Sequence, residues 1–349
     1  MKKVIVIGAG LGGISAAIRM AVKGYQVTVF EASNHPGGKM NSLQMNAYRF
    51  DTGPSLFTMP ELVHELFDLA GENINDYLPY QRLEETCRYF FNDKTIINGY
   101  SEIDKFAAEV QKKTSVENKD VITYLRKSKF IYDTTAYLFL NQSLHKLKTF
   151  LSLKVLFSML KIPFLGVFKS MNQANTDQLK DEKIVQLFNR FATYNGSNPF
   201  LAPAILNIIP HLEFSKGAYF PDNGMYSIAD ALFKLAKKLG VKFEFDKKVN
   251  SIETANNKTI GIKTDNTIFH SDLIICNADI YFTYKHLLKQ AVKAQKVLKQ
   301  ERSTSALIFY WGIKKEFKNL ELHNILFSGD YKNEFSCLQK GTISNDPTV

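Results

Sequence analysis

The chain has 349 residues, of which 45% are hydrophobic and 22% are charged. This composition excludes an intrinsically disordered chain, and the length predicts two domains or one large composite domain. The 44 Lys and Arg residues exceed the 34 Asp and Glu residues, so the formal net charge is +10. That charge permits nucleic acid, an anionic membrane or a phosphate-bearing ligand as a partner.

The three cysteines, Cys87, Cys276 and Cys337, are far apart in sequence and form no CxxC or Cys/His spacing. The sequence therefore predicts neither a disulfide framework nor a zinc site, and it favours a reducing compartment. No uninterrupted apolar run reaches the roughly 18 residues of a membrane-spanning helix, which excludes an ordinary transmembrane protein.

The first elements in chain order are a strand, a glycine-rich turn, a helix and a second strand. Residues 4–7 are a β-branched run typical of a buried parallel strand, and glycines follow it at once. These glycines argue against the alternative, a secretion signal. Residues 14–23 predict a helix, and residues 26–30 predict a strand that ends at Glu31.

The rest of the chain predicts a discontinuous first domain. Residues 88–216 have a helical and aromatic pattern without strand alternation, whereas strand patterns return afterwards. We therefore predict an α/β fold with a Rossmann-type domain formed by residues 1–85 and 215–288. Residues 86–214 and 289–349 form the inserted substrate-binding domain. Strands are predicted at 218–220, 241–245, 260–264, 273–276, 305–313 and 324–328, and the chain is expected to be incomplete at Val349, which no closing helix precedes.

The glycines after the first strand have the spacing Gly8-x-Gly10-x-x-Gly13. The first permits a tight turn, the second a close approach of backbone to a pyrophosphate, and the third close helix packing. The helix N-terminus offers free N–H groups to phosphate oxygens, and Glu31 can accept hydrogen bonds from a ribose while repelling a 2′-phosphate. The pattern predicts an adenine dinucleotide rather than NADP, although small-residue helix packing also produces such spacings by chance.

A second glycine pair, Gly37-Gly38-Lys39, follows shortly after Glu31. An extended backbone and a cation at this point favour FAD over NAD, because they can contact the pyrophosphate and ribityl side of a flavin. The alternative is an ordinary glycine turn beside a solvated lysine.

Several motifs together resemble one family. They are residues 8–13, Glu31, residues 37–39, Phe50-Asp51-Thr52-Gly53-Pro54-Ser55, Asn195-Gly196-Ser197-Asn198-Pro199, residues 217–224 and Asn277-Ala278-Asp279. In order and spacing they are similar to FAD-dependent carotenoid desaturases of the bacterial phytoene desaturase type. Residues 195–213 and 224–226 look more like the 1-hydroxycarotenoid 3,4-desaturases within that family.

The resemblance implies a cofactor, FAD, and a set of residues that hold it. Gly8, Gly10, Gly12 and Gly13 would hold the pyrophosphate, Glu31 the adenosine ribose, and Gly37, Gly38 and Lys39 would contact the cofactor. Gly53 and Ser55 would lie near the flavin, with the backbone of Val249 close to the adenine. The alternative for Val249 is an ordinary strand residue.

The activity implied by the resemblance is desaturation of a carotenoid polyene, phytoene or a hydroxycarotenoid, in carotenoid biosynthesis. A flavin accepts the hydride, and the protein mainly orients and desolvates the substrate. The catalytic residues are unknown, because Glu213, His211 and Asp133 are more readily surface or structural residues than bases. No HExxH or GxSxG motif supports metal catalysis or hydrolysis.

Residues 126–169 carry eight basic side chains and one acidic one, Asp133, interleaved with aromatic residues. This composition is typical of an interfacial membrane segment, and its alternative is a helix pair with solvated lysines. We expect a cytoplasmic protein bound peripherally to the inner face of the cell membrane. Nucleic acid is the poorer explanation of the charge, because no recognised motif accompanies it.

Two other functions remain open at this point. A flavin amine oxidase-like enzyme would share the first glycines, Glu31 and the second glycine pair, but it requires a polar, aromatic-caged amine site that the sequence does not display. A truncated, non-catalytic fragment would bind the dinucleotide at most.

Overall fold

The computed structural model describes residues 1–143, 146, 149, 155, 158, 161–256, 258–265, 267–289, 294–300, 302 and 305–349. The chain forms two compact units, each built from two separate stretches of sequence. Unit 1 consists of Met1–Gln81 and Tyr219–Arg302, and unit 2 of Arg82–Ala218 and Ser303–Val349. The chain passes from one unit to the other after residues 81, 218 and 302, and the predicted domain bounds stay predictions. The roles assigned to the two domains stay predictions.

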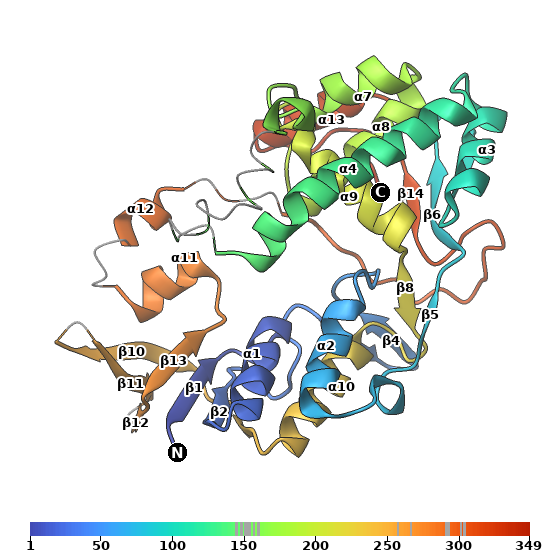
Figure 1. Cartoon of the computed structure of the whole chain (residues 1–349). Helices are drawn as coiled ribbons and strands as arrows, with labels where there is room; N and C mark the ends of the chain where they lie inside the picture. The colour runs from blue at the N-terminus through green and yellow to red at the C-terminus, as the bar shows by residue number, and fades with distance from the viewer. Residues whose placement is uncertain are drawn as a thin grey trace. The chain divides into compact units, whose positions relative to one another are not determined.

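Unit 1 contains a parallel four-stranded sheet with the order β13-β1-β2-β9. Its strands are β1 (Lys3–Ile7), β2 (Gln26–Phe30), β9 (Lys242–Glu244) and β13 (Leu273–Cys276). Helix α1 (Leu11–Val22) connects β1 to β2. The helices α2 (Glu61–Ala70) and α10 (Tyr226–Lys238) both contact α1 (Figure 1).

Both faces of β1 are covered, which explains its uninterrupted apolar sequence. Val4 and Val6 belong to the core that includes α1 and α10, whereas Ile5 and Ile7 pack with Ile262 and its neighbours in a second core. The second core lies on an antiparallel sheet of β10 (Val249–Ala255), β11 (Lys258–Thr264) and β12 (Thr267–His270). A strand between two layers has no polar face, so alternation is absent.

Unit 1 also contains several smaller helices and strands. They are the hairpin β3 (Ser42–Met45) and β4 (Tyr48–Asp51), η1 (Ile74–Asp76), the paired β5 (Tyr80–Arg82) and β8 (Tyr219–Pro221), α11 (Ile280–Phe282), η6 (Thr283–Leu287) and α12 (Ala294–Leu298).

Unit 2 combines a three-stranded sheet with helices. The sheet has the order β14-β6-β7 and consists of β14 (Asn324–Leu326), β6 (Glu85–Phe90) and β7 (Ile96–Tyr100). The helices are α3 (Ile103–Lys113), α4 (Asn118–Asn141), η2 (Ile162–Leu165), α7 (Met171–Leu179), α8 (Glu182–Asn189), η3 (Arg190–Asn195), η4 (Ala204–Ile208), α9 (Ile209–His211), η5 (Leu212–Lys216) and α13 (Tyr331–Gln339).

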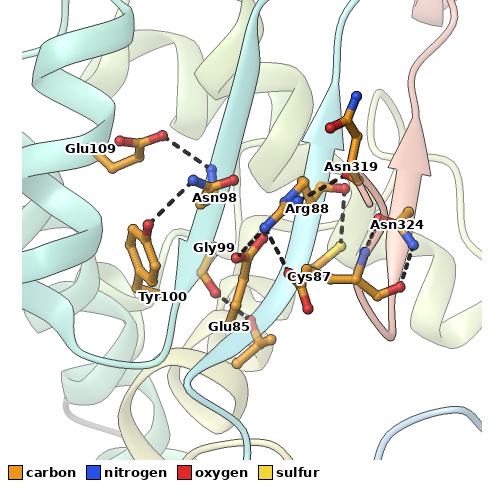
Figure 2. Close-up of polar contacts among 11 residues, drawn as sticks. Glu85, Cys87, Arg88, Asn98, Gly99, Tyr100, Glu109, Asn319 and Asn324 are labelled. Atoms are coloured by element: carbon orange, nitrogen blue, oxygen red, sulfur yellow. Dashed lines mark hydrogen bonds and ion pairs between the residues drawn. The ribbon is translucent and has the colours of Figure 1, made fainter. Parts of the chain in front are cut away.

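A long-range polar contact attaches β14 to this sheet. Arg88 on β6 donates to both carboxylate oxygens of Glu85 at 2.8 Å and to the carbonyl of Asn319 at 2.9 Å, while Asn324 binds the backbone of Glu321 (Figure 2). The guanidinium of Arg88 thus holds the segment before β14 against β6. Arg88 is 231 residues before Asn319, so no local pattern predicts the contact.

Three sequence-based expectations about unit 2 were wrong. Residues 88–216 were expected to lack strands, but β7 and the second half of β6 lie there, paired around a turn at Lys94 whose φ is +68°. Residues 305–313 were expected to form a strand, but they form none, and Leu307 and Trp311 are 73% and 70% exposed. A strand needs a backbone partner as well as apolar residues. A helix does precede the chain end, since α13 ends ten residues before Val349.

A buried ion pair lies in the core of unit 2. Arg190 and Glu213 are 4% and 2% exposed, and their charged groups are 2.6 Å apart. Thr86 and Tyr194 also donate hydrogen bonds to the Glu213 carboxylate, at 3.2 and 2.8 Å. The ring of Phe191 lies 4.1 Å from the guanidinium carbon. Glu213 is therefore a structural residue, one of the two roles expected for it.

We predict that Glu213→Gln lowers the free energy of unfolding by about 3–5 kcal/mol, because it leaves the Arg190 charge buried without its counter-charge. Urea denaturation followed by circular dichroism measures this. The matched control is Asp133→Asn, which removes an exposed pair with Lys129 (54% and 58% exposed) and costs less than about 1 kcal/mol. Equal effects of the two substitutions would contradict the assignment.

Candidate functional site

The turn between β1 and α1 has no room for side chains. Gly8 follows β1 with φ +95°, and its N–H donates to the carbonyl of Phe30 at 2.8 Å. A Cβ atom on Gly13 would lie 2.0 Å from the Gly8 carbonyl oxygen, and one on Gly12 would lie 2.6 Å from Oδ1 of Asn277. Gly10 is the N-cap of α1, and no side chain accepts a hydrogen bond at this cap. The first turn of a 12-residue helix is thus left open to an anion.

The second glycine pair lies directly against this turn. The N–H of Gly37 donates to the carbonyl of Ala9 at 2.9 Å, and Gly37 forms a parallel bridge with Gly10. Gly37 and Gly38 have φ values of +116° and +61°, and a Cβ on Gly38 would lie 3.0 Å from the Cα of Gly10. Two segments that are distant in sequence therefore meet backbone to backbone, which only glycine allows at these positions.

Glu31 lies beside the same turn, at the carboxyl end of β2. Its Oε2 accepts the N–H of Ala9 at 2.7 Å, and its Oε1 accepts the N–H of Ser33 at 2.9 Å. These bonds fix the carboxylate while each oxygen keeps a lone pair. The arrangement can accept hydrogen bonds from a diol.

A cavity of about 490 Å³ opens at this edge of the parallel sheet. Gly8, Glu31 and the buried Val249 line it, together with Lys248 and Lys289. Ligands of open parallel sheets bind outside the carboxyl ends of the strands, at a point such as this one. A tight glycine cradle, an open helix N-terminus, a fixed carboxylate and a cavity with two lysines fit the adenosine diphosphate part of a dinucleotide.

The structure does not bring every predicted site residue to the cavity. Gly8, Glu31 and Val249 line it, whereas the other glycines of the two turns, Gly10, Gly12, Gly13, Gly37 and Gly38, are not part of its wall. Lys39, Gly53 and Ser55 do not line it either, and the side chains of Lys39 and Ser55 are exposed. Gly53 does lie against the second glycine pair, since a Cβ on it would be 2.2 Å from the carbonyl oxygen of Lys39. The predicted contacts of these three residues with a flavin stay predictions.

Asp51, in the motif that contains Gly53, caps a helix. Its carboxylate accepts the backbone N–H groups of Met225 at 2.8 Å and Tyr226 at 3.3 Å, at the start of α10. The hydroxyl of Tyr226 donates to the carbonyl of Pro36 at 3.2 Å, next to the glycine pair. The capped helix therefore supports the turn that faces Gly10.

Asn277 belongs to one of the motifs that carry the family resemblance, but no role at the site was predicted for it. It follows β13, its N–H donates to Ile7 at 2.9 Å, and a Cβ on Gly10 would lie 3.3 Å from its Nδ2. The available signal was a polar residue directly after a strand that neighbours β1, because such residues meet at one edge of a parallel sheet.

Among the described residues, no group of three or more His, Cys, Asp or Glu side chains could hold a metal ion. Within the same part of the chain, no helix is both long enough and apolar enough to cross a bilayer.

Comparison with known proteins agrees with this geometry. Residues 11–344 match the family described as flavin containing amine oxidoreductase. The chain is 45% identical, over 100% of its length and 71% of the relative's, to a 1-hydroxycarotenoid 3,4-desaturase of Flavobacterium sp.. It is 32% identical, over 100% of its length and 70% of the relative's, to a 4,4'-diapolycopene oxygenase of Methylomonas sp.

A solved structure of an oxidoreductase from Methanosarcina mazei shares the fold, with a TM-score of 0.55 at 20% sequence identity. The matched region covers 85% of this chain and 63% of that one, so the chain spans less than two thirds of the solved structure.

The parallel sheet, the glycine cradle and these matches define a flavin-dependent oxidoreductase with a Rossmann-type nucleotide domain. The chain belongs to the flavin-containing amine oxidoreductase family, and its resemblance to the carotenoid desaturases is confirmed. This membership confirms the predicted fold class and FAD as the cofactor.

We predict that Gly10→Glu abolishes flavin uptake. The new carboxylate would occupy the helix N-terminus that phosphate oxygens need, while a negative charge at that end leaves α1 itself stable. The ratio of visible flavin absorbance to protein, after saturation with FAD, measures the effect.

The control variant is Lys23→Glu, at the exposed C-terminal end of the same helix, which should retain flavin. Normal flavin occupancy in folded Gly10→Glu protein would contradict the placement of the site.

Proposed function

We propose that the chain is an FAD-dependent desaturase that introduces a C=C bond into a carotenoid during carotenoid biosynthesis. The observation that carries this proposal is the 45% identity to a 1-hydroxycarotenoid 3,4-desaturase over 100% of the chain. The finer proposal for the substrate is phytoene or a hydroxycarotenoid.

The residues of unit 1 hold and orient the cofactor in this proposal. Gly8, Gly10, Gly12 and Gly13 admit the pyrophosphate, Glu31 binds the ribose, and Gly37, Gly38 and Lys39 complete the cradle. Gly53 and Ser55 lie towards the flavin, and Val249 lies beside the adenine. When bound, the flavin supplies a two-electron acceptor for the hydride that leaves the substrate together with a proton from the neighbouring carbon. No residue of this chain is assigned as a base.

Unit 2 is proposed as the substrate-binding domain. A polyene offers few polar groups, so its binding depends on burial of hydrocarbon, at about 25 cal/mol per Å². The largest aromatic side chains of unit 2, among them Phe106, Phe188 and Phe214, are fully buried and contact one another, so they form an ordinary core.

An amine oxidase receives less support from the described part of unit 2. The faces of Tyr89, Phe191 and Tyr194 surround the guanidinium of Arg190 at 4.1 to 5.9 Å. This aromatic cluster therefore already holds a cation of the chain itself, and it offers no cage for an amine.

We predict that the chain, produced in carotenoid-forming cells, converts the host pigment into one with a longer conjugated system. Separation of the extracted pigments and their absorption spectra measure the conversion. Gly10→Glu is the control for a folded protein without flavin. Unchanged pigment in cells that contain flavin-loaded protein would exclude the desaturase activity and favour the alternative of a non-catalytic fragment.

We also propose that the chain binds the surface of the cytoplasmic membrane from the inside. In the basic stretch 126–169, of which part lies outside the described residues, Phe168 is 87% exposed next to the exposed Lys169. Lys161 lies 5.6 Å from the ring of Phe130, itself 38% exposed. Exposed aromatics beside lysines support an interfacial contact, whose apolar part enters the lipid while the cations face the headgroups.

We predict that the protein sediments with anionic liposomes at low salt and is released as salt screens the lysines. The double variant Lys161→Glu with Phe168→Ser should sediment at least several-fold less. The matched control is Lys112→Glu with Leu338→Ser, which removes an exposed lysine and an exposed leucine elsewhere in unit 2. Absence of sedimentation at low salt would contradict the proposal.

A further inference from the structure

A second cavity, of about 670 Å³, lies within unit 2 between α4, η2, α7 and η4. Its inner wall includes the buried side chains of Tyr124, Ile131, Ala204 and Asn207. The exposed Lys127, Phe168 and Lys169 lie at its outer side. Ser128, Asp177 and Gln178 also line the cavity, so a largely apolar wall carries several polar groups, which is the usual composition of a ligand site.

A chain of asparagine side chains starts at this inner end. Asn207 donates its Nδ2 to Oδ1 of Asn175 at 2.8 Å, Asn175 donates to Asn189 at 2.9 Å, and Asn189 donates to Asn172 at 2.8 Å. Tyr124 also donates its hydroxyl to Oδ1 of Asn175, at 3.0 Å. Asn207, Asn175 and Asn189 therefore each direct the NH₂ group to the next asparagine of the chain.

This direction decides what Asn207 can offer to a ligand. Its Oδ1 is buried and has no hydrogen-bond partner, and the residue as a whole is 6% exposed. With the bonds between Asn175, Asn189 and Asn172 in place, a flip of the Asn207 amide alone would set its oxygen against Oδ1 of Asn175, so Asn207 presents an acceptor. A buried acceptor without a donor costs free energy, which a ligand with a donor would recover.

We infer that this cavity binds an apolar molecule that carries a hydroxyl group, and that the hydroxyl donates to Oδ1 of Asn207. Apolar side chains such as Ile131 and Ala204 bury the hydrocarbon body. A cationic donor is disfavoured, because it would lose its hydration against an apolar wall, where the lining carboxylate of Asp177 is already paired with Lys169 at 2.6 Å. An ionised carboxylate has no proton to donate. A neutral alcohol satisfies each of these conditions.

Two sources share this chemistry: the hydroxylated end of a carotenoid and a free isoprenoid alcohol. The inference concerns unit 2 alone and does not rest on the proposed desaturase activity, so a failure of pigment conversion leaves it intact.

The test compares the affinities of geraniol and its methyl ether, which has a similar body but no donor, by isothermal titration calorimetry. The wild-type protein should bind geraniol about tenfold more tightly than the ether, as one additional buried hydrogen bond predicts. Asn207→Leu should bind both about equally. Asn175 keeps the donor Tyr124 in that variant, so the network survives the substitution.

Two further variants keep the result interpretable. Asn172→Ala changes the far end of the asparagine chain, so the tenfold preference for geraniol should remain. Ala174→Leu narrows the cavity, so the affinity for both geraniol and its methyl ether should fall. Equal affinities in the wild type, no binding of either probe, or a preference that survives in Asn207→Leu would each overturn the inference, the last because a group other than Asn207 would then bind the hydroxyl.

A second measurement distinguishes the two sources. The protein is incubated with detergent micelles that contain either a hydroxylated carotenoid or the parent hydrocarbon, and the amount of each pigment that stays bound to the protein is compared. Selective retention by the wild type but not by Asn207→Leu identifies the carotenoid end. A preference seen only with geraniol identifies a free alcohol.

Discussion

The structure of unit 1 depends on the backbone contact between the turn after β1 and the turn after β2. Gly10 and Gly37 form a bridge there, and a Cβ on Gly38 would lie 3.0 Å from the Cα of Gly10. A side chain on Gly38 would press on Gly10, whereas one on Gly10 clears Gly38, with its Cβ 4.0 Å from that Cα, and would fill the space at the N-terminus of α1. Glu31 secures the same contact from the side, because it accepts the N–H of Ala9 between the two glycines of the first turn.

This contact is supported by parts of the chain that are far away in sequence. Asp51 caps α10, and Tyr226 of that helix holds the carbonyl of Pro36 in the second turn. Asn277, after β13, fills the space beside the glycines of the first turn. Residues near positions 50, 226 and 277 therefore contribute to one site, which explains why the motifs that resemble the carotenoid desaturases are distributed along most of the chain.

The sequence alone predicted the parts of the fold that local patterns determine. The strands β1 and β2, the helix between them and the approach of Glu31 to the glycine turn follow from apolar runs and glycine spacing. The hairpin of β6 and β7 was missed, and the segment 305–313 was wrongly expected to be a strand, because strand formation depends on a partner that sequence periodicity does not identify. Asn277 and the cap by Asp51 were missed as site elements for the same reason, since both depend on contacts across more than 170 residues.

The two polar clusters of unit 2 obey different constraints. In the first, the Glu213 carboxylate receives donors from Arg190, Thr86 and Tyr194, so its charge is satisfied within the protein. In the second, each asparagine donates its NH₂ group to the oxygen of the next one. The first amide of such a chain receives no donor from the chain, so its oxygen is left as a free acceptor. That end is Asn207, at the wall of a cavity, and not Asn172, whose oxygen accepts from Asn189. A protein that needed only a filled core could replace these asparagines with apolar residues, as buried polar groups rarely add stability over well-packed hydrocarbon. A polar chain that ends at a cavity instead gives that cavity a preference for one kind of ligand group.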